Sequence, residues 1–195
     1  MNIDEKLLQI KNLANDTAIL RKSVIDDLGK PLIELSAVIS GVIGSGGKIL
    51  IAGNGGSAAD AQHFAGEMIV RLTSDRNRQS LPAISLTADT AVLSAAANDF
   101  GFENIFSRQV EGLGHKGDLL FLISTSGNSL NLIKAAHVAR ERGMITVGLL
   151  GNNGGKLASM VDKVLIVPHP STQRIQEEHI FLIHLLVGLV ESDLF

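Results

Sequence analysis

The sequence predicts an α/β fold, a three-layer sandwich in which a central parallel sheet of five strands is flanked by helices. Five short apolar runs rich in β-branched residues carry this prediction, and helix-compatible segments separate them. The runs are apolar throughout rather than alternating with polar residues. Continuous apolar strands joined by helical crossovers are typical of a parallel sheet that is covered on both faces.

The elements follow in order along the chain. Residues 1–46 are predicted to form N-terminal helices, because an apolar stripe of helical period runs from Leu7 to Leu28 and Pro31 suits the first turn of a second helix through about Ile43. Residues 47–195 form the predicted α/β core. No linker or change in composition divides the chain, so we expect a single domain over residues 1–195. The predicted strands span residues 48–52, 81–86, 119–124, 145–150 and 163–167.

Composition excludes several classes of protein. The 195 residues include no cysteine, so disulfides, thiolate nucleophiles and cysteine-ligated zinc are excluded. The net charge of −3, without a basic block and without Trp or Tyr, argues against nucleic-acid binding. The N-terminus lacks a secretory signal, and charged or His residues interrupt every hydrophobic stretch before it reaches membrane-spanning length. We therefore expect a cytoplasmic protein that does not contact membranes.

Loops at the carboxyl ends of parallel strands are the usual ligand sites of such sheets. The first predicted strand leads into the glycine-rich segment 53–60, where Ser57 and Asp60 have capping-box spacing at the start of a helix. The third leads into Ser124–Ser129, four hydroxyls around a glycine before a predicted helix over residues 130–142. Backbone N–H groups at a helix N-terminus favour anions, so this loop is a candidate phosphate site. A third glycine loop, 151–155, is expected only to turn the chain.

Acid/base and metal-type side chains concentrate in two distant segments. His63 and Glu67 are four residues apart, so they share one face of a helix. Gln176 and His184 are eight apart, which leaves them roughly 80° apart around a helix and able to serve one cavity. Brought together, the four side chains could hold a divalent metal or pass protons to and from a substrate.

Each feature also has an ordinary structural interpretation. Gly53-x-Gly55-x-x-Ala58 matches a dinucleotide fingerprint, but the expected acidic residue after the second strand is missing, since Asp89 arrives late. The serine loop could be a hydroxyl-rich turn and helix cap. His63 with Glu67 could be a solvated helix pair, and His184 could be a hydrogen-bonded core residue within its apolar helix. Their joint occurrence favours a functional site.

Several motifs of the chain resemble those of the SIS (sugar isomerase) domain of phosphoheptose isomerases. The resemblance runs from about residue 3 to the C-terminus, with the motifs in matching order. It implies a flavodoxin-like SIS fold and the conversion of sedoheptulose 7-phosphate to D-glycero-D-manno-heptose 7-phosphate, the first step toward the heptose precursors of lipopolysaccharide and other surface glycans. The motifs are residues 53–64, 81–84, 98–101, 124–129 and 174–177.

The resemblance also implies roles for individual residues. It makes Glu67 the catalytic base and His184 the catalytic acid, within a homotetramer that holds one Zn²⁺ per subunit. The implied zinc ligands are His63, Glu67, Gln176 and His184. The implied substrate contacts are Asn54, Gly55, Gly56, Glu67, Asn98, Asp99, Ser124, Thr125, Ser126, Ser129 and Gln176.

Two alternatives to this activity stay open. The chain could be a non-catalytic SIS module that binds a sugar phosphate or a protein, like the relative that associates with the bacterial replication initiator. That relative shares the glycine and serine loops but lacks the equivalents of Glu67 and His184. An isomerase acting on another sugar phosphate is the second alternative. One departure from the isomerases is Gln173, where some members have an acidic residue.

The C-terminal segment predicts assembly. Residues 175–190 are apolar on most of the helical circumference, and the N-terminal helices add further apolar stripes. A domain of 195 residues has limited interior in which to bury such a helix together with a parallel sheet. We therefore expect a homo-oligomer, a tetramer with paired two-fold interfaces, in which these helices pack across subunits near an active site.

Overall fold

The computed structural model describes residues 1–195 and contains one five-stranded parallel sheet, so the predicted fold class is confirmed. The strand order is β2-β1-β3-β4-β5, which is the flavodoxin-like doubly wound order. Each predicted strand lies within two residues of its observed bounds. The strands are β1 (Ile49–Gly53), β2 (Ala83–Ser85), β3 (Leu119–Ser124), β4 (Ile145–Gly151) and β5 (Lys163–Val167).

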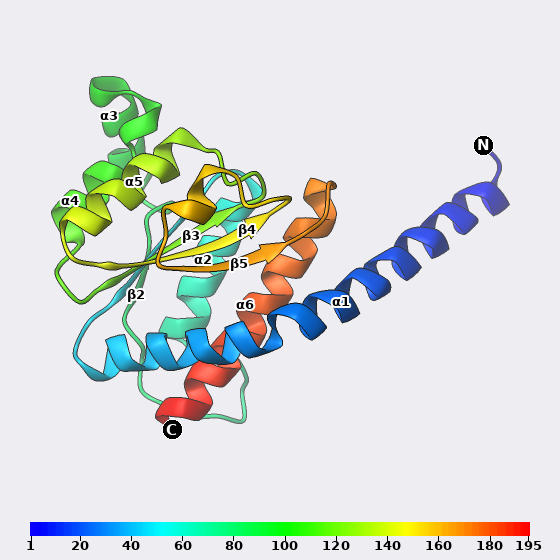
Figure 1. The fold of residues 1–195 in the computed structure, drawn as a ribbon, viewed down its shortest axis with the longest axis horizontal. Helices are drawn as coiled ribbons and strands as arrows, with labels where there is room; N and C mark the ends of the chain where they lie inside the picture. Colours follow the sequence, from blue (N-terminus) through cyan, green and yellow to red (C-terminus); the bar gives the residue numbers. More distant parts are fainter.

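Helices cover both faces of this sheet (Figure 1). Helices α1, α2 and α6 pack on one face, and α3, α4 and α5 pack on the other. None of them combines the length and the apolar composition that crossing a bilayer requires. The helices are α1 (Ile3–Gly44), α2 (Gly56–Ile69), α3 (Thr90–Phe100), α4 (Ser107–Leu113), α5 (Leu130–Glu141) and α6 (Thr172–Leu194), with 3₁₀ turns η1 (Phe102–Asn104) and η2 (Lys156–Ser159).

The central strands are buried on both faces, which explains why their sequences are apolar throughout. Successive side chains of a strand point to opposite faces. Ile49 and Ile51 of β1 therefore join the core beneath α1, α2 and α6, while Leu50 and Ala52 join the core beneath α3, α4 and α5. All five residues of β1 and all six of β3 are buried. The carboxyl ends of these two neighbouring strands are thus held rigidly side by side.

The prediction of two N-terminal helices was wrong, because α1 is one helix of 42 residues with Pro31 in its interior. Proline removes one backbone donor and costs roughly 3 kcal/mol inside a helix. Packing outweighs this local cost, since Val24 on one side of Pro31 and Leu32 and Leu35 on the other are all buried in the same core. At its start, Asn2 and Glu5 form a reciprocal capping box.

Most of the exposed apolar residues of the two long helices lie on α1, and fewer lie on α6. Helix α6 buries most of its apolar residues from Ile175 to Val190 against the sheet and α1, but Leu185 is exposed. The expectation that this helix packs across subunits stays a prediction. The N-terminal half of α1 extends away from the sheet (Figure 1). Its exposed apolar residues are Ile3, Leu7, Leu8, Ile10, Leu13 and Ile19.

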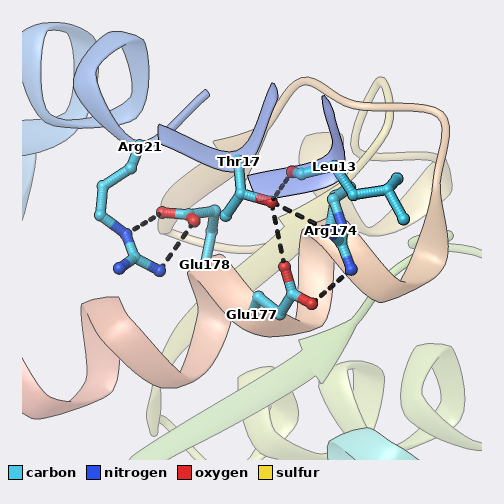
Figure 2. Close-up of polar contacts among 6 residues, drawn as sticks. All are labelled: Leu13, Thr17, Arg21, Arg174, Glu177 and Glu178. Carbon is cyan, nitrogen blue, oxygen red and sulfur yellow. Dashed lines mark hydrogen bonds and ion pairs between the residues drawn. The ribbon is translucent and has the colours of Figure 1, made fainter. Parts of the chain in front are cut away.

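Polar contacts tie α1 to the first turns of α6 (Figure 2). Arg21 donates from Nε and Nη2 to both carboxylate oxygens of Glu178, which is fully buried. The hydroxyl of Thr17 accepts from Arg174 Nη1 at 2.9 Å, and Arg174 also contacts Glu177. These contacts fix the orientation of the helix that carries Gln176 and His184.

Candidate functional site

A small polar pocket lies where β1 and β3 end. The order of the sheet reverses between these two strands, which is the position where ligands bind in doubly wound folds. The pocket has a volume of about 90 Å³ and only one hydrophobic lining residue. It brings together residues from the glycine loop, the serine loop and α6, namely Asn54, Ser57, Ile123, Ser124, Thr125, Ser126, Ser129 and Gln176.

Two hydroxyls of the serine loop form hydrogen bonds within the loop itself. Ser124 Oγ accepts from the N–H of Gly127 at 3.0 Å, and Ser126 Oγ accepts from the N–H of Asn128. Ser129 precedes the first turn of α5, but its side chain makes no capping bond. The interpretation as a hydroxyl-rich turn therefore holds for Ser124 and Ser126, whereas the Ser129 hydroxyl stays available to a ligand beside the helix N-terminus.

The loop at residues 151–155 does more than turn the chain. Gly127 has a positive φ of 63°, and a Cβ there would collide with the carbonyl of Gly154. The carbonyl oxygen of Gly127 accepts from Leu157 N, and the side chain of Asn128 accepts from Lys156 N. Glycine at position 127 thus lets the two loops pack backbone to backbone, and the later loop supports the serine loop from behind.

The glycine loop differs from its prediction at the start of α2. The helix begins at Gly56 with Gly55 as its N-cap, and no side chain caps it, so the expected capping box of Ser57 and Asp60 was wrong. Ser57 is already inside the helix and buried. A Cβ on Gly56 would collide with the side-chain amide of Gln176, so this glycine allows α6 to approach the loop.

Asn54 holds the glycine loop to the serine loop. Its side-chain amide exchanges two hydrogen bonds with that of Asn131, at 2.9 and 2.8 Å. Asn131 lies in the first turn of α5 and is buried. Sequence reasoning missed Asn131, because nothing in its local pattern marks it.

The acid/base residues form a second cluster beside this pocket. His63 Nε2 lies 2.8 Å from His184 Nε2 and 3.3 Å from Glu67 Oε1. The prediction that His63 and Glu67 share one face of a helix is confirmed, and α6 brings His184 against that face. The side chain of His63 is about 43% exposed and that of Glu67 is 18% exposed, so the cluster is open to small molecules.

Helices α2 and α6 each contribute to both parts of the site. Helix α2 begins at the pocket with Gly56 and Ser57 and carries His63 and Glu67 further along. Helix α6 places Gln176 in the pocket and His184 in the cluster two turns later. The same two helices therefore carry residues of both the pocket and the cluster, with about two helical turns between Gln176 and His184.

The cluster has the composition of a metal site. Ligand atoms of His63, Glu67 and His184 all lie within 4.8 Å of one another. Two imidazoles and a carboxylate are a ligand set that catalytic zinc sites use with a fourth position open. The three side chains thus fit a divalent cation, and the same three groups can also transfer protons.

Asp60 lies close to the cluster, but sequence reasoning gave it only a role in capping the helix that starts near Ser57. Burial raises the pKa of its carboxyl to about 6, against the effect of the nearby His63, which lowers it. Its Oδ2 is buried without a hydrogen-bond partner in the chain. Asp60 lies one turn before His63 on α2, so its charge state bears directly on the cluster.

Asn98 and Asp99 lie apart from these two groups. Both are exposed at the end of α3, and the Asn98 side chain donates to Asp99 at 2.8 Å. Asp99 lines a separate, mostly apolar hollow of about 680 Å³ between α3 and α4. The structure of one chain therefore does not bring these two predicted substrate contacts to the pocket at β1 and β3.

Comparisons with known proteins agree with this geometry. A model of the SIS domain matches residues 14–151. A phosphoheptose isomerase of Trichlorobacter lovleyi is 49% identical over 95% of this chain and 93% of its own length. The structure of a phosphoheptose isomerase from Neisseria gonorrhoeae is similar with a TM-score of 0.89 at 42% identity, over 95% of this chain and 98% of that chain. A Francisella tularensis phosphoheptose isomerase gives a TM-score of 0.92 at 32% identity, over 96% and 98%.

Proposed function

Since the chain belongs to the SIS-domain family of phosphoheptose isomerases, we propose that it converts sedoheptulose 7-phosphate to D-glycero-D-manno-heptose 7-phosphate. The observation that carries this proposal is the cluster of His63, Glu67 and His184 beside a hydroxyl-lined pocket. A non-catalytic sugar-phosphate module has no need of a carboxylate and two imidazoles at that position. The product is a precursor for surface-glycan heptose.

The reaction requires two proton transfers, which the cluster can supply. A proton leaves C1 of the ketose and another arrives at C2 through an enediol, while a proton moves from the C1 oxygen to the C2 oxygen. Glu67, whose Oε1 lies 3.3 Å from His63 Nε2, acts as the base toward carbon. His184 serves the oxygens. A positioned acid or base of this kind contributes about 10² to 10⁴-fold.

The pocket holds the other end of the substrate. The helix start at α5 and the hydroxyls of Thr125 and Ser129 bind the phosphate, and Gln176, Asn54 and the glycine loop contact the sugar chain between phosphate and cluster. Binding energy from this remote group orients the reacting carbons against Glu67 and His184. Asn98 and Asp99, which lie elsewhere on the chain, reach a substrate only if another subunit brings them there.

The cluster is also the proposed zinc site. His63, Glu67 and His184 supply its ligands, with Gln176 from the adjoining pocket as the fourth. When bound, zinc polarises the carbonyl and stabilises the enediolate. The absence of cysteine makes the donor set one of nitrogen and oxygen only, which binds zinc less tightly than thiolates.

Assembly into a homotetramer completes the proposal, with residues 1–195 as one domain and the cytoplasm as its location. The row of exposed apolar residues on the first half of α1 supports an oligomer, because a single soluble chain rarely leaves so many on one helix. An apolar hollow of about 490 Å³ between α1 and α6 includes His184 in its lining, which places the cluster beside a surface that another subunit can cover.

A proton NMR time course with sedoheptulose 7-phosphate tests the proposed activity. We expect the ketose signals to decline while an aldose with an anomeric proton accumulates, without any added redox cofactor. The matched substrates are fructose 6-phosphate and ribulose 5-phosphate, which present the same C1–C2 chemistry at other chain lengths. Conversion of either of them instead of the heptulose would show that the substrate assignment is wrong, and no conversion of any would contradict the isomerase.

A further inference from the structure

A buried ion pair joins the segment after α2 to the last turns of α6. Arg78 Nε lies 2.7 Å from Glu191 Oε1, and the two side chains are only 1% and 3% exposed. The same carboxylate oxygen accepts from the backbone N–H of Leu72. Burying both charges costs free energy unless their remaining hydrogen-bonding groups are also satisfied, so the pair needs further partners.

The other donors of Arg78 are used on the end of α2. Nη2 donates to the carbonyl oxygen of Glu67 at 2.7 Å, and Nη1 donates to that of Met68 at 2.8 Å. Carbonyls in the last turn of a helix have no partner within the helix, and a cation there also interacts favourably with the helix dipole. Helix α2 has no basic residue in its own last turn. Arg78 supplies that cation from ten residues further along the chain.

Both ends of this contact lie close in the chain to cluster residues. The guanidinium holds the backbone of Glu67 itself, whose side chain faces His63. Glu191 follows His184 by seven residues on α6, which is two helical turns and the same face. Glu67 is therefore connected to His184 by a hydrogen bond to Arg78, the ion pair of Arg78 with Glu191, and two turns of α6.

From this path we infer that Arg78 and Glu191 are positioning residues, which set the spacing between Glu67 and His184 for the proposed proton transfers. The planar fork of arginine is required, because it contacts three carbonyls, including that of Gln79, and a carboxylate at fixed angles. Neither residue reaches the pocket. The inference rests on the proposed isomerase function, and misplacement of reacting groups by about 1 Å can cost 10²-fold in rate.

Two conservative variants and one control test the inference. Glu191→Gln keeps the size of the side chain but removes its charge, and Arg78→Lys keeps the charge but loses the fork. The control is Asp118→Asn, which breaks a less deeply buried pair with Lys48, whose side chain is 24% exposed, at the opposite, amino-terminal edge of β1 and β3. Steady-state kinetics with sedoheptulose 7-phosphate are measured at a temperature where circular dichroism shows each variant fully folded.

For both test variants we expect kcat to fall by about tenfold or more while KM changes by less than about threefold, because the pocket is untouched. Asp118→Asn is expected to lower the melting temperature without this loss of kcat. If Glu191→Gln does not fold, Arg78→Lys tests the inference alone, because this variant keeps a cation opposite Glu191. Folded variants with wild-type kcat would reduce the pair to a stabilising contact. An inactive wild-type protein would instead overturn the proposed function.

Discussion

The two parts of the candidate site are built in different ways. The pocket at β1 and β3 is made of short loops that combine local hydrogen bonds, such as that from Gly127 to Ser124, with longer-range ones, such as those between Asn54 and Asn131. The cluster of His63, Glu67 and His184 exists only because two helices more than a hundred residues apart in sequence pack together. The loops at the strand ends thus position the proposed substrate-binding groups, whereas the packing of α2 on α6 positions the proposed proton-transfer groups.

This difference predicts that substitutions in the pocket and in the cluster affect different kinetic quantities. Changes in the pocket remove contacts that substrate and transition state share, so they weaken binding more than they lower kcat. Changes in the cluster remove groups that act only as bonds to hydrogen break, so they lower kcat. Variants of each part therefore test whether the two parts act as we propose.

The largest effect is expected for Glu67→Gln. The amide keeps the size of the side chain but cannot accept a proton from carbon, so kcat should fall by at least about 10²-fold while substrate binding survives. Turnover is measured by NMR, and binding by calorimetry with the same sugar phosphate. The decisive measurement is exchange of the C1 hydrogen with deuterated solvent. Exchange at the wild-type rate in this variant would show that another residue is the base.

A smaller effect, on binding, is expected for Ser129→Ala. The loss of one hydrogen bond to a charged group should weaken the affinity for sedoheptulose 7-phosphate by roughly tenfold. The free energy of unfolding should change by less than about 0.5 kcal/mol, because the hydroxyl makes no capping bond in the chain. Calorimetry and urea unfolding measure the two quantities.

Ser124→Ala is the matched comparison within the same loop. Its hydroxyl accepts from the N–H of Gly127, so its removal should lower stability as well as affinity. Equal affinity of wild type and Ser129→Ala would reassign position 129 to a plain turn. A loss of stability in Ser129→Ala as large as that in Ser124→Ala would contradict the division between structural and ligand-binding hydroxyls.

Sequence reasoning recovered the features that have a local signature. The five strands were predictable because strands buried on both faces are apolar throughout, and the four-residue spacing of His63 and Glu67 was enough to place them on one helix face. The same reasoning failed at Pro31 and at the start of α2. In both places the local rule gave way to packing, of α1 on the core and of Gln176 against Gly56.

Other residues have no signature that one sequence could reveal. Asn131 pairs with Asn54 across neighbouring strands, and Arg78 reaches Glu191 across more than a hundred residues. A lone arginine in a polar loop is ordinarily solvated, so only its burial shows that it holds the end of α2. Long-range polar contacts of this kind depend on register and helix packing, which no spacing rule specifies.

Helix α6 carries one proposed catalytic histidine, His184, and one structural histidine, His179. Of the substitutions considered, replacement of His179 should have the smallest effect on turnover. His184 faces the cluster, whereas His179 is fully buried, with Nε2 3.1 Å from the carbonyl oxygen of Leu150.

Burial lowers the pKa of His179 to about 4, although its hydrogen bond to Leu150 acts in the opposite direction. Because the folded pKa lies below the unfolded value of 6.5, the unfolded chain binds a proton first as the pH falls. The stability contributed by neutral His179 is therefore complete above pH 6.5 and is lost between about pH 6.5 and 4, by roughly 3 kcal/mol in all. His179→Gln should remove this part of the acid dependence while leaving kcat at pH 7.5 unchanged, as measured by urea unfolding at several pH values and by NMR turnover. Parallel stability curves for the wild type and the variant would show that the pKa of His179 is the same in the folded and unfolded chains, which would contradict the effect of burial.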